Sequence, residues 1–291
     1  NDNYNLTVPY FGTFLNDTAI KSLMSTGLIE GYDNQELITD LLKYYRNDYD
    51  FVKDQSEGDE KLMFQRLEYV TKNFEIDSCH ILNDWESIGH GLSLFKKNEM
   101  HSINAGNPFN NSALILGPGT GLGAAQVINN DIVLPTEIGN SILSIDSLMV
   151  SSTLKDSTDF NVIEDLISGR GISNIYRHFS GIDKSPENIL LTYEDDELAR
   201  KCIDQFLISL SQVLSELSLA YIPGNGIYLA GGLMRSLRPF IDTDEFIKNF
   251  LVNRKPMHKD LLEKISISLI EKEMTCLHGN LNYFNKLIFE K

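Results

Sequence analysis

The chain has 291 residues, 42% of them hydrophobic and 23% charged, so it is long enough to bury a sizeable core and to form two lobes. Its formal net charge of −16 argues against a nucleic-acid partner, because a phosphate backbone is bound by clustered lysine and arginine. No stretch approaches 18 uninterrupted apolar residues, so we expect no transmembrane segment.

The three cysteines, Cys79, Cys202 and Cys276, are odd in number and far apart. This pattern is typical of buried thiols in a reducing compartment rather than of a disulfide framework. We therefore expect an intracellular protein, and the cytoplasm and the mitochondrial matrix suit it equally. The first residue, Asn1, is neither an initiator methionine nor the start of a secretory signal, which is consistent with a mature or trimmed form.

The first 75 residues are expected to form three short strands, arranged as an antiparallel meander, and two helices. The expected strands cover residues 5–11, 18–24 and 27–31, and the expected helices lie near 37–45 and 62–70.

A short apolar strand is predicted at 79–82, ending at Asn83 and Asp84. The spacing of apolar residues over 85–95 predicts a helix directly after it. The polar, glycine-containing stretch 96–111 is interpreted as a linker between lobes.

The second part of the chain mixes strands and helices. Residues 113–116 form a predicted strand that runs into a glycine-rich turn, and two further strands make a hairpin around residues 129–131. Helices are predicted over 172–179 and 196–221, a strand at 226–230, and an alternating strand near 265–269. This order predicts two α/β lobes, with a small lobe at 1–105 and a large lobe at 106–291.

The glycine turn, defined here as residues 117–123 (Gly-Pro-Gly-Thr-Gly-Leu-Gly), is the strongest local signal. Glycines permit a tight turn whose amides converge on an anion, and Thr120 adds a hydroxyl donor. The spacing does not fit a dinucleotide fingerprint, and a Walker A loop is excluded because no Gly-Lys-Ser/Thr is present. A purely structural turn remains the alternative.

Several other residues have a functional and an ordinary interpretation. Asp84 lies where a general base for phosphoryl transfer could stand, or it caps a helix. Glu137 and Glu164 are candidate hydroxyl-binding carboxylates, or solvated surface acids. Gly231 and Gly232 follow a buried strand and allow close approach of an adenine ring, or form a plain strand-to-helix turn.

The order of these motifs resembles the bacterial-type glucokinase family over roughly 200 residues. The matching motifs are Asn83-Asp84, Gly119-Thr120-Gly121-Leu122-Gly123, Leu134-Pro135-Thr136-Glu137, Glu164-x-x-x-Ser168-Gly169, residues 167–177 and Leu229-Ala230-Gly231-Gly232. The resemblance implies a two-lobed α/β sugar kinase fold of the actin-like ATPase (ribonuclease H-like) class.

The resemblance also implies site residues. Asp84 matches the catalytic base that takes the proton of the glucose 6-hydroxyl. The matches to sugar-binding residues are Asn83, Glu137, Glu164 and, in place of a family histidine, Asn140. The matches to ATP-binding positions are Gly119, Thr120, Gly121, Gly123, Gly231 and Gly232, together with Gly12 and Thr13 in the first phosphate loop.

The first loop departs from the family's Asp-x-Gly-Gly-Thr-Asn, because the matching stretch 9–14 has Pro9 at the metal-holding Asp and Phe11 at the first Gly. In the sugar site, Ile138 and Asn140 replace a glycine and the histidine. Two hypotheses follow. Either catalysis is lost or weak and the protein serves as an interaction subunit with a protein partner, or it is an active ATP- and Mg²⁺-dependent hexose kinase. A metal-site enzyme is a third and weaker interpretation, because the six histidines show no ligand spacing, and we assign no metal ligand.

Overall fold

The computed structural model describes residues 5–10, 78–142, 154 and 160–289. The chain divides into two compact units, one formed by Asn1–Asp84 with Asn280–Lys291 and the other by Trp85–Gly279. The lobe boundary expected at residues 105 and 106 stays a prediction.

The first unit contains two paired strands, β1 (Asn5–Tyr10) and β2 (Ser78–Asn83). They run parallel, with Pro9 opposite Leu82 and Tyr10 opposite Asn83. The strand predicted at 79–82 is therefore confirmed. The meander strands predicted at 18–24 and 27–31, and both helices predicted before residue 75, lie outside the described residues.

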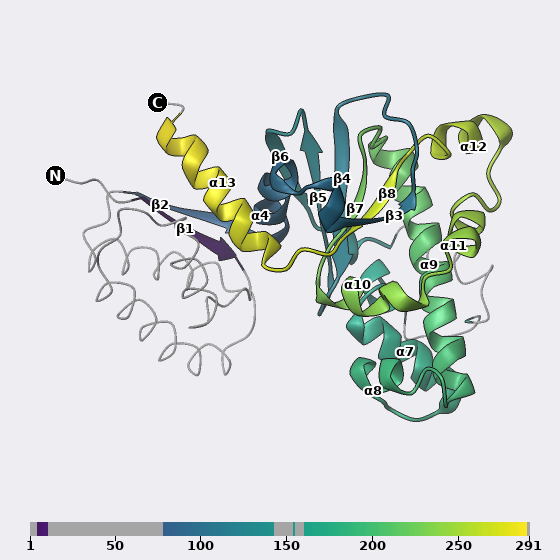
Figure 1. The fold of residues 1–291 in the computed structure, drawn as a ribbon. Helices are drawn as coiled ribbons and strands as arrows, with labels where there is room; N and C mark the ends of the chain where they lie inside the picture. The colour runs from purple at the N-terminus through teal and green to yellow at the C-terminus, as the bar shows by residue number, and fades with distance from the viewer. Residues whose placement is uncertain (1–4, 11–77, 143–153, 155–159, 290–291) are drawn as a thin grey trace, which may run out of the picture. The chain divides into compact units, whose positions relative to one another are not determined.

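The second unit is built on a six-stranded mixed sheet with the order β3-β8-β7-β4-β5-β6 (Figure 1). The strands are β3 (Met100–Asn104), β4 (Ser112–Pro118), β5 (Leu122–Ile128), β6 (Ile132–Thr136), β7 (Gly226–Leu229) and β8 (Ile267–Ile270). The three central strands β4, β7 and β8 are parallel, whereas the outer pairings are antiparallel.

Both faces of this sheet are covered, as the alternation along β4 illustrates. Leu114 and Leu116 belong to the hydrophobic cluster shared with the long helix α9 (Glu197–Tyr221). Ala113 and Ile115 belong to the opposite cluster, shared with α4 (Asp84–Gly91). Because successive side chains of a strand point to opposite faces, a continuous apolar run is what a strand covered on both sides requires.

Among the other helices of the described residues, α7 (Gly169–Ser180) and α11 (Thr243–Phe250) pack on α9. The short 3₁₀ turns are η1 (Leu92–Leu94), η2 (Lys97–Glu99), η3 (Ile138–Asn140) and η4 (Arg238–Phe240). The helices are α6 (Ile163–Leu166), α7 (Gly169–Ser180), α8 (Pro186–Leu191), α10 (Gly232–Leu237), α11 (Thr243–Phe250), α12 (Pro256–Leu262) and α13 (Thr275–Phe289).

The linker predicted over 96–111 is wrong in its middle part, which forms η2 and the sheet strand β3. Only Ile103 of β3 is buried, because β3 lies at the edge of the sheet and pairs with β8 alone. A strand at an edge with a single buried side chain has no apolar alternation, so its sequence looks like a loop.

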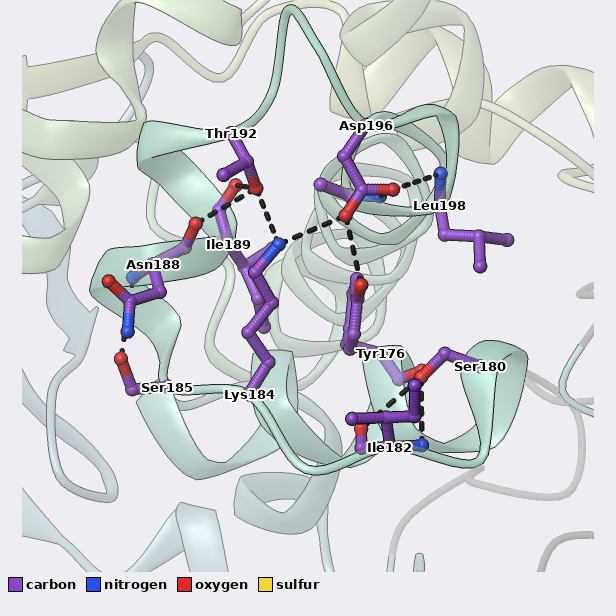
Figure 2. Close-up of polar contacts among 11 residues, drawn as sticks. Tyr176, Ser180, Ile182, Lys184, Ser185, Asn188, Ile189, Thr192, Asp196 and Leu198 are labelled. Carbon is purple, nitrogen blue, oxygen red and sulfur yellow. Dashed lines mark hydrogen bonds and ion pairs between the residues drawn. The ribbon is translucent and has the colours of Figure 1, made fainter.

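The N-terminus of α9 is held by a polar network around Asp196 (Figure 2). The Asp196 carboxylate caps the helix by accepting hydrogen bonds from the backbone amides of Leu198 (2.9 Å) and Ala199 (3.2 Å). Its other oxygen accepts from Lys184 Nζ and from the Tyr176 hydroxyl, both at 2.9 Å. The network thus ties α7 and the turn before α8 to the start of the longest described helix.

Among the described helices, none combines the length and the apolar composition needed to cross a lipid bilayer. Cys202 and Cys276 are buried, as expected from the cysteine pattern.

Candidate functional site

The glycine turn joins β4 to β5, and the pairing of the strands brings Gly117 opposite Gly123. The turn closes with a hydrogen bond from the Gly119 amide to the Gly121 carbonyl oxygen (2.7 Å). Gly119 and Thr120 are exposed at its tip, and a Cβ added to Gly119 would meet no atom within 4 Å. The tip therefore has open space in front of it, which an anion bound to backbone amides requires.

The base of the turn packs on Trp85, the second residue of α4. A Cβ added to Gly117 would lie 2.7 Å from Trp85 Cη2, and one added to Gly123 would overlap the indole ring. Gly123 therefore requires glycine because the aromatic ring occupies the space of a side chain, and Gly117 requires it because the Ala230 carbonyl oxygen and the ring share that space.

Glu164, in α6, lies against the other side of the turn. Its Oε2 accepts a hydrogen bond from the Leu122 amide (3.3 Å) and would lie 2.5 Å from a Cβ on Gly121 and 3.2 Å from one on Gly139. This carboxylate therefore stands between the glycine turn and η3, two segments that the sequence predicts to be functional.

Arg170 holds the second oxygen of the same carboxylate. Its Nη2 lies 3.2 Å from Glu164 Oε1 and 3.2 Å from Asp165 Oδ1. The preceding residue, Gly169, donates its amide to the Gly119 carbonyl oxygen (2.8 Å). The start of α7 is therefore attached to the glycine turn by a backbone hydrogen bond and to Glu164 by an ion pair.

Glu137 and Asn140 flank η3, and both side chains are exposed. The Asn140 amide donates to the Glu137 carbonyl oxygen (3.1 Å), and the Ile163 amide donates to the Ser141 carbonyl oxygen (3.0 Å). Gly139 is buried against the Leu122 carbonyl oxygen. The backbone thus positions η3 beside the glycine turn and α6, with two polar side chains facing solvent.

Gly231 and Gly232 follow β7, which lies next to β4 in the sheet. Gly231 has a φ of 102°, a conformation that strongly favours glycine. A Cβ on Gly231 would lie 3.8 Å from the Pro118 carbonyl oxygen, so this turn is a direct neighbour of the glycine turn. Gly232 begins α10.

Asn83 and Asp84 stand where β2 ends and α4 begins, as predicted. Asn83 is opposite Tyr10 at the end of β1, in the first unit. Gly12 and Thr13, assigned to the first phosphate loop, lie outside the described residues.

The structure therefore assembles the predicted residues of the second unit in one place: the glycine turn, Glu164, η3 and the Gly231–Gly232 turn. It also reveals two neighbours that the sequence interpretation gave no role, Trp85 and Arg170. The sequence marks both residues. Trp85 is the only tryptophan and follows Asp84 directly, and Arg170 lies within the matching stretch 167–177.

Chemically, this arrangement offers an exposed threonine at the tip of the turn for an anion, with carboxylate oxygens beside the turn as acceptors for hydroxyl groups. In the described part of the chain, no group of three or more histidine, cysteine or acidic side chains is placed to hold a metal ion.

Comparison with known proteins shows which family the chain resembles. The sequence profile described as Glucokinase matches residues 64–287. A glucokinase-like protein of Xylella fastidiosa (strain 9a5c) is 30% identical over 225 residues, which cover 72% of this chain and 65% of the relative. The chain thus spans less than two thirds of that relative's length.

Solved structures show the fold. A glucokinase from an Antarctic psychrotroph superposes with a TM-score of 0.63 at 21% identity, covering 76% of this chain and 72% of that one. A ROK family glucokinase from Streptomyces griseus, in complex with glucose and AMPPNP, gives a TM-score of 0.52 at 13% identity, covering 74% and 70%. The expected α/β sugar kinase fold is confirmed.

Proposed function

The chain belongs to the glucokinase family, and on this premise we propose that it binds glucose and ATP but transfers the phosphoryl group slowly or not at all. The observation that carries the proposal is the assembled site of the second unit, in which the glycine turn, Glu164 and Gly231 are direct neighbours. A relative named as a complex with glucose and AMPPNP supports the choice of these two ligands.

In this proposal, the glycine turn binds the phosphates of ATP. The Thr120 hydroxyl and the Thr120 and Gly121 amides donate to phosphate oxygens, because the Gly119 and Leu122 amides already have partners, and the Gly231–Gly232 turn receives the adenosine side. The residues present fit this ligand, because a Cβ at Gly119 would meet nothing within 4 Å and Gly231 exposes backbone at a φ of 102°. ATP supplies the phosphoryl group.

Glu164, Glu137, Asn140 and Asn83 bind the hydroxyl groups of the sugar. A carboxylate whose two oxygens accept from an amide and a guanidinium has a fixed orientation and retains lone pairs for a hydroxyl donor. Asp84 is the general base that would accept the proton of the attacking hydroxyl.

Slow transfer follows from the first loop. Pro9, within β1, replaces the metal-holding Asp of the family motif and has no backbone N–H to donate. Phosphoryl transfer depends on positioning and charge neutralisation, and the loss of one preorganised contact costs roughly 10²–10³ in rate. A chain that binds its ligands yet reacts slowly would act through a protein partner, as an interaction subunit.

The second candidate is an active hexose kinase. The observation that favours it is Asp84, which stands at the strand-to-helix junction where the base is expected. Measured turnover distinguishes the two candidates, because both predict ligand binding.

Calorimetric titration with glucose, and then with Mg-AMPPNP, tests the proposal. We expect saturable binding of both ligands, and we expect Glu164→Gln to weaken glucose binding about tenfold or more, because hydrogen bonds to charged groups contribute about 1.5–3 kcal/mol. Glu187→Gln, at an exposed carboxylate of α8, is the matched control and should leave the affinity unchanged. Absence of heat with both ligands from a folded protein would refute the proposal.

A further inference from the structure

Trp85 stands out because its ring occupies the space that the two outer glycines of the turn leave free. It is the only tryptophan of the chain and packs with the hydrophobic cluster that contains Ile88, Ile115 and Val127. That cluster lies on the face of the sheet covered by α4, so the indole contacts the base of the glycine turn from that face.

The contact is made at one cross-strand pair. Gly117 and Gly123 face each other across β4 and β5, one pair before the last pair of the ladder, Pro118 with Leu122. A Cβ at either position would collide with the indole, at 2.7 Å from Cη2 for Gly117 and within the ring for Gly123. One rigid ring therefore supports the ends of both strands at the point where the turn begins.

The opposite side of the turn is held by different groups. Glu164 accepts from the Leu122 amide (3.3 Å), and Gly169 donates to the Gly119 carbonyl oxygen (2.8 Å). Trp85 therefore supports the base of the turn, and Glu164 and Gly169 hold one side of it. Within the turn, only the tip at Gly119 and Thr120 is exposed. A preorganised set of amides needs this kind of support, because the amides contribute most when they do not reorganise upon binding.

We propose that Trp85 is a positioning residue of the phosphate site, which holds the ends of β4 and β5 so that the amides of the glycine turn keep the spacing that a phosphate requires. The inference rests on the proposed function, since the turn is taken to bind the phosphates of ATP. Trp85 also follows Asp84 in the chain, so the residue that supports the phosphate turn and the proposed base occupy the first two positions of α4.

The first test needs no ligand. Hydrogen exchange of the turn amides is compared in the wild type, Trp85→Ala, Trp85→Phe and Phe95→Ala. Phe95 is the matched control, because it is a buried aromatic of the same cluster whose ring lies next to Gly91 of α4, away from the two outer glycines of the turn. We expect Trp85→Ala to accelerate exchange over residues 117–123 about tenfold more than Phe95→Ala does, and Trp85→Phe to restore most of the protection. Equal effects of the two alanine variants on the turn would overturn the proposal.

The second test uses Mg-AMPPNP as the probe. We expect Trp85→Ala to weaken its binding by about fivefold or more, Trp85→Phe to recover part of the loss, and Phe95→Ala to bind like the wild type. Unchanged affinity in Trp85→Ala, with AMPPNP binding in the wild type, would overturn the inference. If the wild type itself does not bind AMPPNP, the proposed function fails, and the exchange experiment still decides the role of Trp85.

A double-variant cycle tests the contact between Trp85 and Gly123 by stability alone. Gly123→Ala alone should lower the urea midpoint strongly, because its methyl group collides with the indole. Gly123→Ala in the Trp85→Ala background should cause a much smaller shift, since the obstacle is absent. Additive shifts would show that the indole does not occupy the space beside Gly123 and would refute the proposal.

Discussion

In the sequence Glu164 looks like one of many surface acids, whereas in the structure its carboxylate contacts the glycine turn and η3. Two of its neighbours, Gly121 and Gly139, can approach closely because they have no side chain, and a third, Leu122, donates its backbone amide. The carboxylate is also paired with the half-exposed Arg170, and such exposed ion pairs contribute at most about 1 kcal/mol. The backbone and the glycines therefore position this side chain more than the ion pair does.

Gly121→Ala tests this close approach. The new Cβ would lie 2.5 Å from Glu164 Oε2, so the side chain or the turn has to shift. We expect a loss of about 1–3 kcal/mol in the free energy of unfolding measured with urea. Gly119→Ala is the matched control, because its Cβ meets no atom within 4 Å and should change stability by less than about 0.5 kcal/mol. Equal losses in the two variants would contradict the geometry.

Cys202 offers a second test at the same scale. Burial raises the pKa of its thiol to about 12, and the thiol donates to the Ile172 carbonyl oxygen at 3.2 Å. Because the thiolate is the reactive form, the native thiol should stay unmodified by iodoacetamide at pH 8 and become reactive in urea. Peptide-resolved mass spectrometry measures this, and labelling of Cys202 at the same rate in both states would contradict its placement.

At the scale of elements, the network at the start of α9 makes a pH-dependent contribution to stability. The hydrogen bonds from Lys184 and Tyr176 lower the pKa of Asp196 from 3.8 to about 2. Because the pKa is lower in the folded state, the contribution is present above pH 3.8 and is lost as the pH falls toward 2.

Asp196→Asn tests this linkage. Asparagine retains the helix cap but loses the charge, so the variant should be less stable than the wild type at pH 6, and the difference should shrink as the pH falls toward 2. Urea unfolding at several pH values measures the difference. A difference that stays constant from pH 6 to pH 2 would show that the carboxylate does not interact with Lys184 and Tyr176 as described.

Elements with strong periodicity or a clear turn signal could be predicted from the sequence, and the edge strand β3 could not. The helix predicted over 196–221 corresponds to α9, and the hairpin after the glycine turn corresponds to β5 and β6. Asn129 and Asn130 give the hairpin a local signal, because asparagine tolerates the positive φ values of 56° and 58° found there. Strand β3 was missed because its stability comes from pairing with β8, a partner 163 or more positions away in the sequence.

At the scale of the molecule, the order of motifs along the chain identified the family, and the structure explained part of that order. The glycine turn, η3, α6 and the turn after β7 are separate in sequence and adjacent in space. The sequence marked Trp85 and Arg170 but not their roles, because neither the contact of an indole with two glycines nor the pairing of Arg170 with Glu164 leaves a local pattern. The contributions of Gly12 and Thr13 stay predictions.

The central claim is that the chain retains ligand binding while its phosphoryl transfer is slow. The most direct measurement is the rate of glucose 6-phosphate formation at saturating glucose and Mg-ATP, with Asp84→Asn as the background. We predict a wild-type turnover below about 0.1 s⁻¹, given that ordinary enzymes reach about 1–10³ s⁻¹ and one lost contact costs roughly 10²–10³. A wild-type turnover within the ordinary range, abolished by Asp84→Asn, would contradict the account and establish an active kinase.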